Sequence, residues 1–429
     1  MNIGRFSVLR NLIVVMTVCL SATSVAQPKG FNYDEAKVPE FELPPLLTMS
    51  DGTPVTSAAQ WTEMRRPEVL ALFEEHVFGT APPTLPRLRT RVRSRVDNAL
   101  DGLAVRREIT VYFSDDDSGP QMDILVYTPA AATGPVPCFL GLNFKGNHTI
   151  EADPAIHLPM IASAPGKGPP LAPAKESERG TRAGRWPAAM IVEAGFGLAT
   201  IYYGDIDPDF HDDFHNGIHS LWPDQQGADR PANAGGSIAA WTWGLSRALD
   251  VLEGDALVDG HRVAVFGHSR LGKTSLWAGA TDPRFRLVIS NDSGCGGAAL
   301  SRRRFGETVA RINTVFPHWF CRNHRQYNDN ENALPVDHHM LIALAAPRAV
   351  YVASAEKDQW ADPRGEMLSL FHAGPVFKLF DRQGLPSDDL PQIDQPIHTD
   401  VGYHIRTGRH DVTKFDWQQY LNFAKKALQ

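Results

Sequence analysis

The stretch RVAVFGHSRLGKTSLWAG, residues 262–279, runs from an apolar strand pattern through a serine between glycines into a helical pattern. A serine at the tip of such a strand–turn–helix is typical of the nucleophile elbow, whose strained turn holds the hydroxyl above the end of a sheet. Glycines beside it let the strand and helix backbones approach closely. The usual spacing is Gly-x-Ser-x-Gly, whereas here the second glycine falls one place later, at Gly272, and Leu271 stands at the expected position. Because the strand–turn–helix context is intact, we predict that Ser269 is a catalytic nucleophile.

Further apolar runs in the chain indicate strands that are covered on both faces. With the run that leads into the elbow, they occupy residues 136–144, 196–203, 262–266, 287–290 and 348–353. Helical patterns separate them, and the clearest begins with a predicted Ser237 cap. Two alternating stretches, 107–113 and 122–127, come first and predict an antiparallel pair. Together these patterns predict an α/β-hydrolase fold: a mostly parallel central sheet with an antiparallel N-terminal start and helices on both faces, a three-layer sandwich.

The acid and the histidine of a serine triad follow the nucleophile in this fold, in the order Ser, acid, His. His410 lies just ahead of a helix predicted over residues 413–427 and is our preferred general base; His404 is the neighbouring alternative. Asp358 follows the fifth apolar run and Asp292 follows the fourth, so either carboxylate could orient the imidazole. The sequence leaves the choice between these two acids open.

The first 26 residues have the pattern of a secretory signal peptide. Arg5 and Arg10 precede an apolar run over residues 12–20, and small residues lead to Ala26. The run is shorter than the roughly 20 residues that span a bilayer as a helix. We therefore expect cleavage after Ala26, a secreted or periplasmic protein, and no membrane association afterwards.

Residues 27–429 are expected to form a single catalytic domain with an extended N-terminal lead-in. A segment at about 154–187 is rich in Pro, Gly and Ala without periodicity, which predicts a long surface insertion of undetermined role.

The formal net charge of −7 argues against a nucleic-acid partner, since a phosphate-binding surface requires clustered cations. The one dense basic run, residues 302–304, is interpreted as a solvated or substrate-proximal patch.

The cysteines and histidines give no metal-site pattern, and we expect no metal or other cofactor. Cys138, Cys295 and Cys321 remain after signal cleavage, so at most one disulfide can form within the chain. Cys295 and Cys321 would be the pair, and whether they join is left open. The cluster at residues 337–339, Asp-His-His, lacks helical i, i+4 ligand spacing and is assigned a structural role.

Beyond the elbow, several stretches resemble the bacterial branch of the glucuronoyl esterases, carbohydrate esterase family 15. The matching segments are GHSRLGK at 267–273, NDSGCGGAA at 291–299, FGE at 305–307, LPVDHH at 334–339, APR at 346–348, WADP at 360–363, GRHD at 408–411 and FDW at 415–417. The resemblance extends from about residue 32 to the C-terminus. The resemblance rests on the combination of these segments, because each segment alone is weak evidence for the family.

The resemblance implies a serine esterase that hydrolyses, through an acyl-enzyme, the ester between 4-O-methyl-glucuronate of glucuronoxylan and lignin alcohols. It implies that Arg270 contributes to the oxyanion site. It further implies that Lys273 and Glu307 bind hydroxyls of the uronate and that Trp360 lies against the sugar. The family takes its triad acid from either candidate position, so that choice stays open. Fungal members carry Cys-Ser-Arg at the elbow; because His268 stands here instead, the disulfide anchored at that cysteine is not expected.

Each substrate-binding candidate also has a structural interpretation. Lys273 could be a surface lysine, Glu307 could pair with the basic run 302–304, and Trp360 could belong to the core. For the whole chain the alternatives are another carbohydrate or generic carboxylesterase, such as an acetyl-xylan esterase, and a non-catalytic carbohydrate-binding protein. The expected partners are glucuronoxylan and lignin–carbohydrate esters, the expected state is a monomer, and the leaving alcohol is undetermined.

Overall fold

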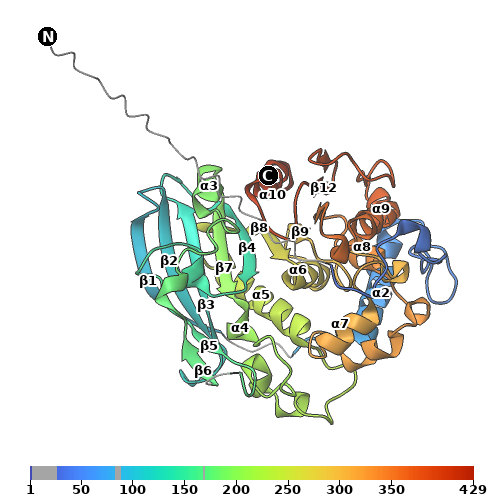
Figure 1. The fold of residues 1–429 in the computed structure, drawn as a ribbon, viewed down its shortest axis with the longest axis horizontal. Helices are drawn as coiled ribbons and strands as arrows, with labels where there is room; N and C mark the ends of the chain where they lie inside the picture. The colour runs from blue at the N-terminus through green and yellow to red at the C-terminus, as the bar shows by residue number, and fades with distance from the viewer. Residues whose placement is uncertain (2–26, 83–87, 168–169) are drawn as a thin grey trace.

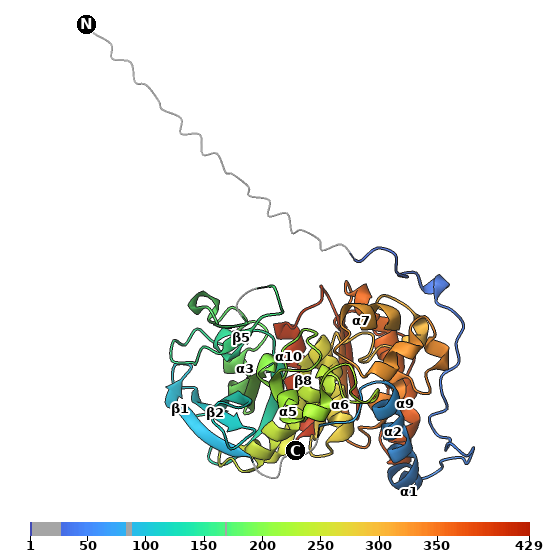
Figure 2. The same ribbon diagram turned by 90° about the horizontal axis from the view of Figure 1, so that it is seen from below.

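A computed structural model describes residue 1 and residues 27–82, 88–167 and 170–429 of the chain. The predicted signal peptide therefore lies, apart from Met1, outside the described residues. Within the described ranges no helix is both long and apolar enough to cross a membrane. In the view of Figure 2 the N-terminal lead-in, drawn in blue, runs around the outside of the molecule to α1 and α2.

A ten-stranded sheet forms the centre of the molecule (Figure 1). In spatial order its strands are β1 (Arg89–Ala99), β2 (Ala104–Tyr112), β3 (Gln121–Pro129), β7 (Gly197–Tyr202), β4 (Val136–Asn143), β8 (Val258–His268), β9 (Leu287–Asn291), β10 (Ala349–Ala355), β12 (Gly402–Arg406) and β11 (Ile397–His398). Neighbours from β1 to β7 pair antiparallel, and neighbours from β7 to β12 pair parallel. β11 closes the edge antiparallel to β12. The predicted mostly parallel sheet with an antiparallel start is confirmed.

Helices cover both faces of this sheet. They are α1 (Ala58–Gln60), α2 (Arg66–His76), α3 (Ala188–Glu193), α4 (Tyr203–Ile206), α5 (Ser237–Glu253), α6 (Arg270–Thr281), α7 (Val309–Val315), α8 (His338–Ala343), α9 (Pro363–Leu379) and α10 (Lys414–Ala427). Val263 and Val265 of β8 belong to the apolar cluster that includes α5 and α6, whereas Ala264 and Phe266 belong to that of α3 and α10. Figure 1 shows these helix pairs on opposite sides of the sheet, which confirms the three-layer sandwich.

Two helix starts illustrate how the sequence sets these elements. At α10 the Thr413 side chain accepts the Asp416 N–H, and the Asp416 carboxylate accepts the Thr413 N–H, so the chain forms a capping box. α5 begins at Ser237, but its N-cap is Gly236, which has no side chain to cap the helix. A Cβ at Gly236 would lie 2.5 Å from the Trp319 carbonyl oxygen. The predicted Ser237 cap is therefore wrong, because close packing fixes a glycine at the cap position.

The sequence pattern does not predict β12, because this strand carries polar residues in the core. His404 and Arg406 are both buried, and both contact the buried carboxylate of Asp416, at 2.9 Å and 2.8 Å. Buried charged groups are tolerated when they are paired and hydrogen-bonded in this way. An apolar-run criterion misses such a strand.

The segment at 154–187 contains structure of its own. β5 (Met160–Ala162) and β6 (Leu171–Pro173) form a separate antiparallel pair. Near the end of the segment, Trp186 is buried against the α10 face of the sheet. The lack of periodicity in this segment therefore reflects short elements rather than an irregular loop throughout.

The basic run is mostly interior, so its interpretation as a solvated patch is wrong. Arg302 donates to the Val336 carbonyl at 2.8 Å and pairs with Asp337 at 3.2 Å. Arg303 pairs with Asp362 at 2.8 Å. Through these contacts the two arginines connect loops at the carboxyl side of the sheet.

Among the residues that the structure describes, the cysteines are free and buried: Cys138, Cys295 and Cys321. The bridge between Cys295 and Cys321 is therefore not formed. Burial raises the pKa of Cys321 to about 11, so little of it is thiolate at neutral pH.

Candidate active site

Four segments that leave neighbouring parallel strands converge at one edge of the sheet. β8 leads to Ser269, β9 to Asp292, β10 to the turn with Asp358, and β12 to the loop with His410. Parallel strands have their carboxyl ends at the same edge, so residues distant in the sequence meet there. The edge is the candidate active site.

Ser269 occupies the predicted elbow between β8 and α6, with φ 58° and ψ −129°. L-residues rarely adopt this conformation, and it turns the chain sharply enough to present the hydroxyl. A Cβ on Gly267 would lie 1.8 Å from the Leu271 carbonyl oxygen, so the turn requires a glycine there. A Cβ on Gly272 would lie 2.9 Å from Cβ of Ser293. The later position of the second glycine thus coincides with a close approach of α6 to the segment after β9.

His410 and Asp358 are arranged as the base and acid of a triad. Nδ1 of His410 lies 2.6 Å from Oδ2 of Asp358. The Asp358 side chain is 7% exposed and that of His410 is 41% exposed, so the imidazole reaches out of the protein toward the cavity. A carboxylate at Nδ1 fixes the tautomer that leaves Nε2 free to accept the serine proton.

Asp292 lies behind this pair. Its Oδ2 accepts the Asp411 backbone N–H at 3.2 Å and the Arg406 guanidinium at 3.4 Å. Single ligand atoms of Asp292, Asp358 and His410 all lie within 4.8 Å of one another. Burial and then the Asp358 charge raise the pKa of Asp292, so its ionised form is disfavoured. The geometry favours Asp358 as the direct partner of the imidazole, with Asp292 in support.

The alternative base, His404, is inaccessible. It is fully buried in β12, with Nε2 2.9 Å from Asp416 and Nδ1 2.9 Å from the Tyr351 hydroxyl. Both ring nitrogens are therefore occupied by structural contacts.

Arg270, the first residue of α6, places its guanidinium among aromatic rings. It forms an ion pair with Asp209 and lies 4.7 Å from the ring centroid of Trp319. Asp209 also contacts Nε2 of His318 at 2.8 Å and accepts the Trp319 indole N–H at 2.7 Å. Although burial raises the pKa of Asp209, the His318 contact and the Arg270 charge hold it at about 2. The cation next to Ser269 is thus held in place by a carboxylate that is ionised at neutral pH.

Lys273 is buried one turn beyond the elbow and is not a surface lysine. Its Nζ donates to the Ser293 and Cys295 carbonyls, at 2.6 Å each, and lies 3.7 Å from Glu307. Glu307 therefore pairs with this lysine and not with the basic run. Burial raises the pKa of Glu307, and the nearby Lys273 charge opposes that rise. Two of the three ammonium donors are occupied, which leaves one beside Glu307.

A cavity of about 960 Å³ opens over these groups. It is lined by all eight candidate residues from the sequence: Ser269, Arg270, Lys273, Asp292, Glu307, Asp358, Trp360 and His410. The predicted nucleophile, the predicted base and the hydrogen-bonding groups thus share one accessible space. We call it the main cavity.

Trp360 lies at the wall of the main cavity and is only partly buried, so it is not a core residue. Its ring meets Phe31 edge-on, with centroids 4.9 Å apart. Gln27 and Pro28 also line the cavity. The first residues after the predicted cleavage site therefore contribute to its wall.

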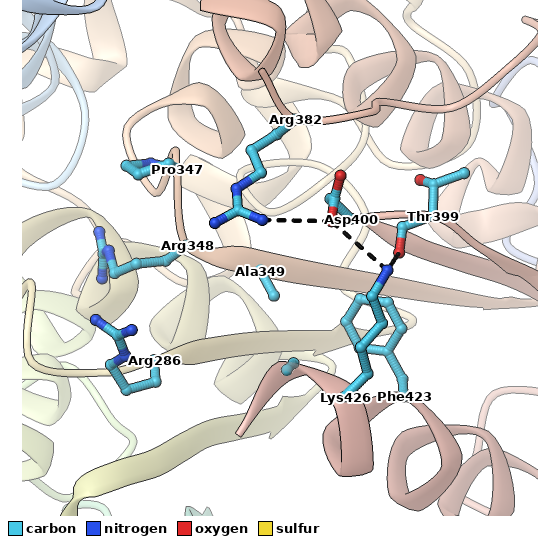
Figure 3. A pocket seen from close by; sticks show the side chains of 10 residues that line it. Arg286, Pro347, Arg348, Ala349, Arg382, Thr399, Asp400, Phe423 and Lys426 are labelled. Carbon is cyan, nitrogen blue, oxygen red and sulfur yellow. Dashed lines mark hydrogen bonds and ion pairs between the residues drawn. The ribbon is translucent and has the colours of Figure 1, made fainter. Parts of the chain in front are cut away.

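A different pocket, of about 210 Å³, lies at the opposite edge of the sheet, where β9 and β10 begin (Figure 3). Arg286, Arg348, Arg382 and Lys426 line it together with Asp400. Asp400 pairs with Arg382 at 3.7 Å and with Lys426 at 3.6 Å. None of the eight candidate residues lines this pocket, so it has no part in the triad chemistry.

Known proteins resemble the chain over most of its length. A family model described as "Glucuronyl esterase, fungi" matches residues 229–381. Carbohydrate esterase MZ0003, from an unknown prokaryotic organism, is 50% identical over 423 residues, which cover 98% of each chain. The solved glucuronoyl esterase from Solibacter usitatus matches with a TM-score of 0.88 and 48% identity, over 92% of this chain and 100% of that one.

The chain belongs to the glucuronoyl esterases, carbohydrate esterase family 15. A fungal relative, 4-O-methyl-glucuronoyl methylesterase 1 of Wolfiporia cocos, is 28% identical over 360 residues, covering 82% of this chain and 72% of that one. This glucuronoyl esterase is accordingly a carboxylic ester hydrolase.

Part of the site of this esterase lies outside any recognisable sequence motif. Asp209 follows α4, and His318 and Trp319 follow α7, in loops without a known motif. Only the aromatic density of residues 316–320, FPHWF, could have pointed to them. Their importance becomes visible only when the fold brings both loops against Arg270.

Proposed function

We propose that this esterase hydrolyses esters that join 4-O-methyl-glucuronate side chains of glucuronoxylan to lignin alcohols. One observation carries the proposal: the Lys273–Glu307 pair, suited to sugar hydroxyls, lines the same cavity as Ser269 and His410. The substrate class in the name of the Wolfiporia cocos relative agrees with it.

Acylation begins when His410 accepts the proton of Ser269 and the serine oxygen attacks the ester carbon. Asp358 stabilises the resulting imidazolium through Nδ1. The imidazolium then donates its proton to the departing alcohol, which leaves a glucuronoyl ester on Ser269. Water, deprotonated by the same histidine, hydrolyses this acyl-enzyme and restores the serine.

Arg270 offers positive charge to the carbonyl oxygen as that oxygen becomes negative. In a nucleophile elbow the backbone N–H of the residue after the serine is a further donor, and here this residue is again Arg270. A preorganised oxyanion donor is worth about 3–4 kcal/mol of transition-state stabilisation. The ion pair with Asp209 supplies that preorganisation.

Recognition of the uronate rests on Glu307, Lys273 and Trp360. The Glu307 carboxylate accepts hydrogen bonds from ring hydroxyls, and the remaining ammonium donor of Lys273, beside Glu307, gives one. Trp360 presents an apolar ring and an N–H to the sugar. A simple acetyl group would engage none of these side chains, so the site is more elaborate than a generic carboxylesterase or acetyl-xylan esterase requires.

We further propose that the predicted signal peptide exports the enzyme to the periplasm or the medium. There it acts as a monomer on glucuronoxylan and lignin–carbohydrate esters. The net charge of −7 gives no basis for nucleic-acid binding.

A rate comparison between benzyl glucuronate, benzyl galacturonate and p-nitrophenyl acetate tests the proposal. We expect the glucuronate to be hydrolysed with the highest kcat/KM, and Ser269→Ala to abolish turnover while retaining binding of the ester. Turnover by Ser269→Ala at the wild-type rate would overturn the serine mechanism. A preference for the acetate would instead indicate a generic esterase.

A further inference from the structure

A second cavity, of about 310 Å³, also reaches the catalytic centre. It shares Ser269, Arg270 and His410 with the main cavity, but it includes none of the three proposed uronate-binding residues. The reacting serine and histidine therefore border two cavities that are otherwise lined by different residues.

The wall of the second cavity is cationic. Lys145, Arg182 and Arg185 line it beside Arg270, and no described aspartate or glutamate does. Arg185 pairs with Asp411 at 2.5 Å. Lys145 and Arg182 are exposed, and neither has an ion-pair partner among the residues that the structure describes. Two cations beside the reaction centre are thus available to a ligand.

The same cavity offers flat apolar surface. Phe144, Trp186 and Tyr203 contribute to its lining. Trp186 is 6% exposed and packs edge-on against Phe266, with ring centroids 5.4 Å apart, so it forms a fixed wall. An aromatic ring of a ligand that enters the cavity would pack against aromatic side chains of similar size.

The cations lie on anchored backbone, although their side chains reach solvent. The Arg182 N–H donates to the Thr149 carbonyl at 2.8 Å. The Arg185 carbonyl accepts the Trp417 indole N–H at 2.8 Å. The carboxyl end of the segment at 154–187 is therefore fastened to the catalytic core at both arginines, and it delivers them to the second cavity.

Each of the two cavities suits a different half of the ester substrate. The main cavity holds the groups that suit the uronate acyl part. The leaving oxygen must lie within reach of His410, which protonates it, so the alcohol extends along the remaining surface at that histidine.

We infer that the second cavity is the leaving-group subsite and that it favours aromatic alcohols carrying an anionic group, such as a ring carboxylate. The inference rests on the proposed function, because it needs the acyl part to be the uronate. The aromatic wall packs on the ring, and Lys145 and Arg182 attract the carboxylate. The segment at 154–187 thereby becomes a determinant of alcohol specificity.

Two glucuronate esters of nearly equal size test the inference: the 4-carboxybenzyl ester and the neutral 4-carbamoylbenzyl ester. Wild-type enzyme should show about fivefold higher kcat/KM for the carboxylate at low salt, as expected from two exposed charge contacts. The preference should shrink at high salt, which screens such contacts. Lys145→Gln and Arg182→Gln should each reduce the ratio, and the double variant should bring it close to one. Lys175→Gln, an exposed lysine of the same segment outside the cavity, is the charge-matched control and should keep the full ratio.

The outcomes separate this inference from the proposed function, because methyl glucuronate is assayed alongside. Hydrolysis of methyl glucuronate with a wild-type carboxylate-to-amide ratio of one would overturn the subsite alone. A ratio retained in the double variant would do the same. Failure of wild type to hydrolyse any glucuronate ester would overturn both. Circular dichroism of each variant shows that the comparison is made on folded protein.

Discussion

Asp209 holds Arg270 in place: its carboxylate pairs with the guanidinium beside the nucleophile and also contacts His318 and Trp319. The aspartate lies 61 positions before the arginine in the chain. It does not face the triad directly, so its influence on catalysis passes through Arg270. We regard Asp209 as a positioning residue.

Replacing Asp209 by Asn should lower kcat/KM for methyl glucuronate by about tenfold to hundredfold, less than the roughly hundred- to thousandfold typical of a lost oxyanion donor. KM should change little, because the contact matters mainly in the transition state. The double variant Asp209→Asn with Arg270→Gln should be no slower than Arg270→Gln alone. Losses that multiply in the double variant would contradict a role exercised through Arg270.

The pKa of Asp209 also predicts a pH dependence of stability. Its folded pKa of about 2 lies below the ordinary value of 3.8, so the native state favours the ionised form. The resulting stabilisation is present above pH 3.8 and is lost as the pH falls toward 2; linkage gives about 2 kcal/mol at pH 5, with roughly half lost by pH 3. Urea unfolding of wild type and Asp209→Asn should therefore differ most near pH 5 and converge on acidification. A stability difference that is constant from pH 5 to pH 3 would count against the ion pair.

Asp358 and Asp292 should separate clearly by mutation. Asp358→Asn should lower kcat by about a thousandfold or more, because the imidazole then loses the carboxylate that holds its tautomer. Asp292→Asn should cost only about tenfold, since its raised pKa already disfavours the charge that the amide lacks. Single-turnover rates on benzyl glucuronate measure both effects. The reverse order of losses would make Asp292 the principal acid.

Glu307 should determine which substrate is preferred, and it should not be needed for ester hydrolysis itself. Glu307→Ala should lower kcat/KM for methyl glucuronate by about ten- to hundredfold, the scale of a lost charged hydrogen bond. The rate on p-nitrophenyl acetate should stay within about threefold of wild type. Glu63→Gln, at an exposed position on the N-terminal helical segment, serves as the control. Equal losses on both substrates would show that Glu307 supports the triad and not the sugar.

Chelation should leave activity unchanged. Asp292, Asp358 and His410 are close enough together to resemble a metal-ligand set, but His410 and Asp358 already share a 2.6 Å hydrogen bond, as the base and acid of a serine triad do. Activity that falls in EDTA and returns with a divalent metal would replace the serine mechanism by a metal-dependent one.

The layers of this fold could be predicted because its strands are covered on both faces and so consist of apolar runs. β4, β8 and β10 are visible for this reason. β12 is hidden, because the core there contains His404 and Arg406 paired with Asp416. An apolar run reveals a strand whose buried residues are apolar. A strand whose buried residues are charged and paired leaves no such run in the sequence.

The candidate site divides in a similar way. Ser269 and His410 follow from local motifs and chain order, and the structure brings them to one cavity. The sequence leaves the two acids equal, because both follow strands that end at the same edge. The 2.6 Å contact to His410 distinguishes Asp358 only in three dimensions. Asp209, Lys145 and Arg182 carry no motif, and their proximity to Ser269 depends on loop paths that the sequence does not encode in any short pattern.

Gln27 and Pro28, at the wall of the main cavity, have a practical consequence. If the signal peptidase cuts after Ala26, the new α-amino group appears within a few residues of the substrate. Cleavage at that site would therefore set the first residue of the mature chain at the wall of the catalytic cavity. Recombinant protein with an N-terminal affinity tag would carry foreign residues at that wall, and a C-terminal tag would leave it clear.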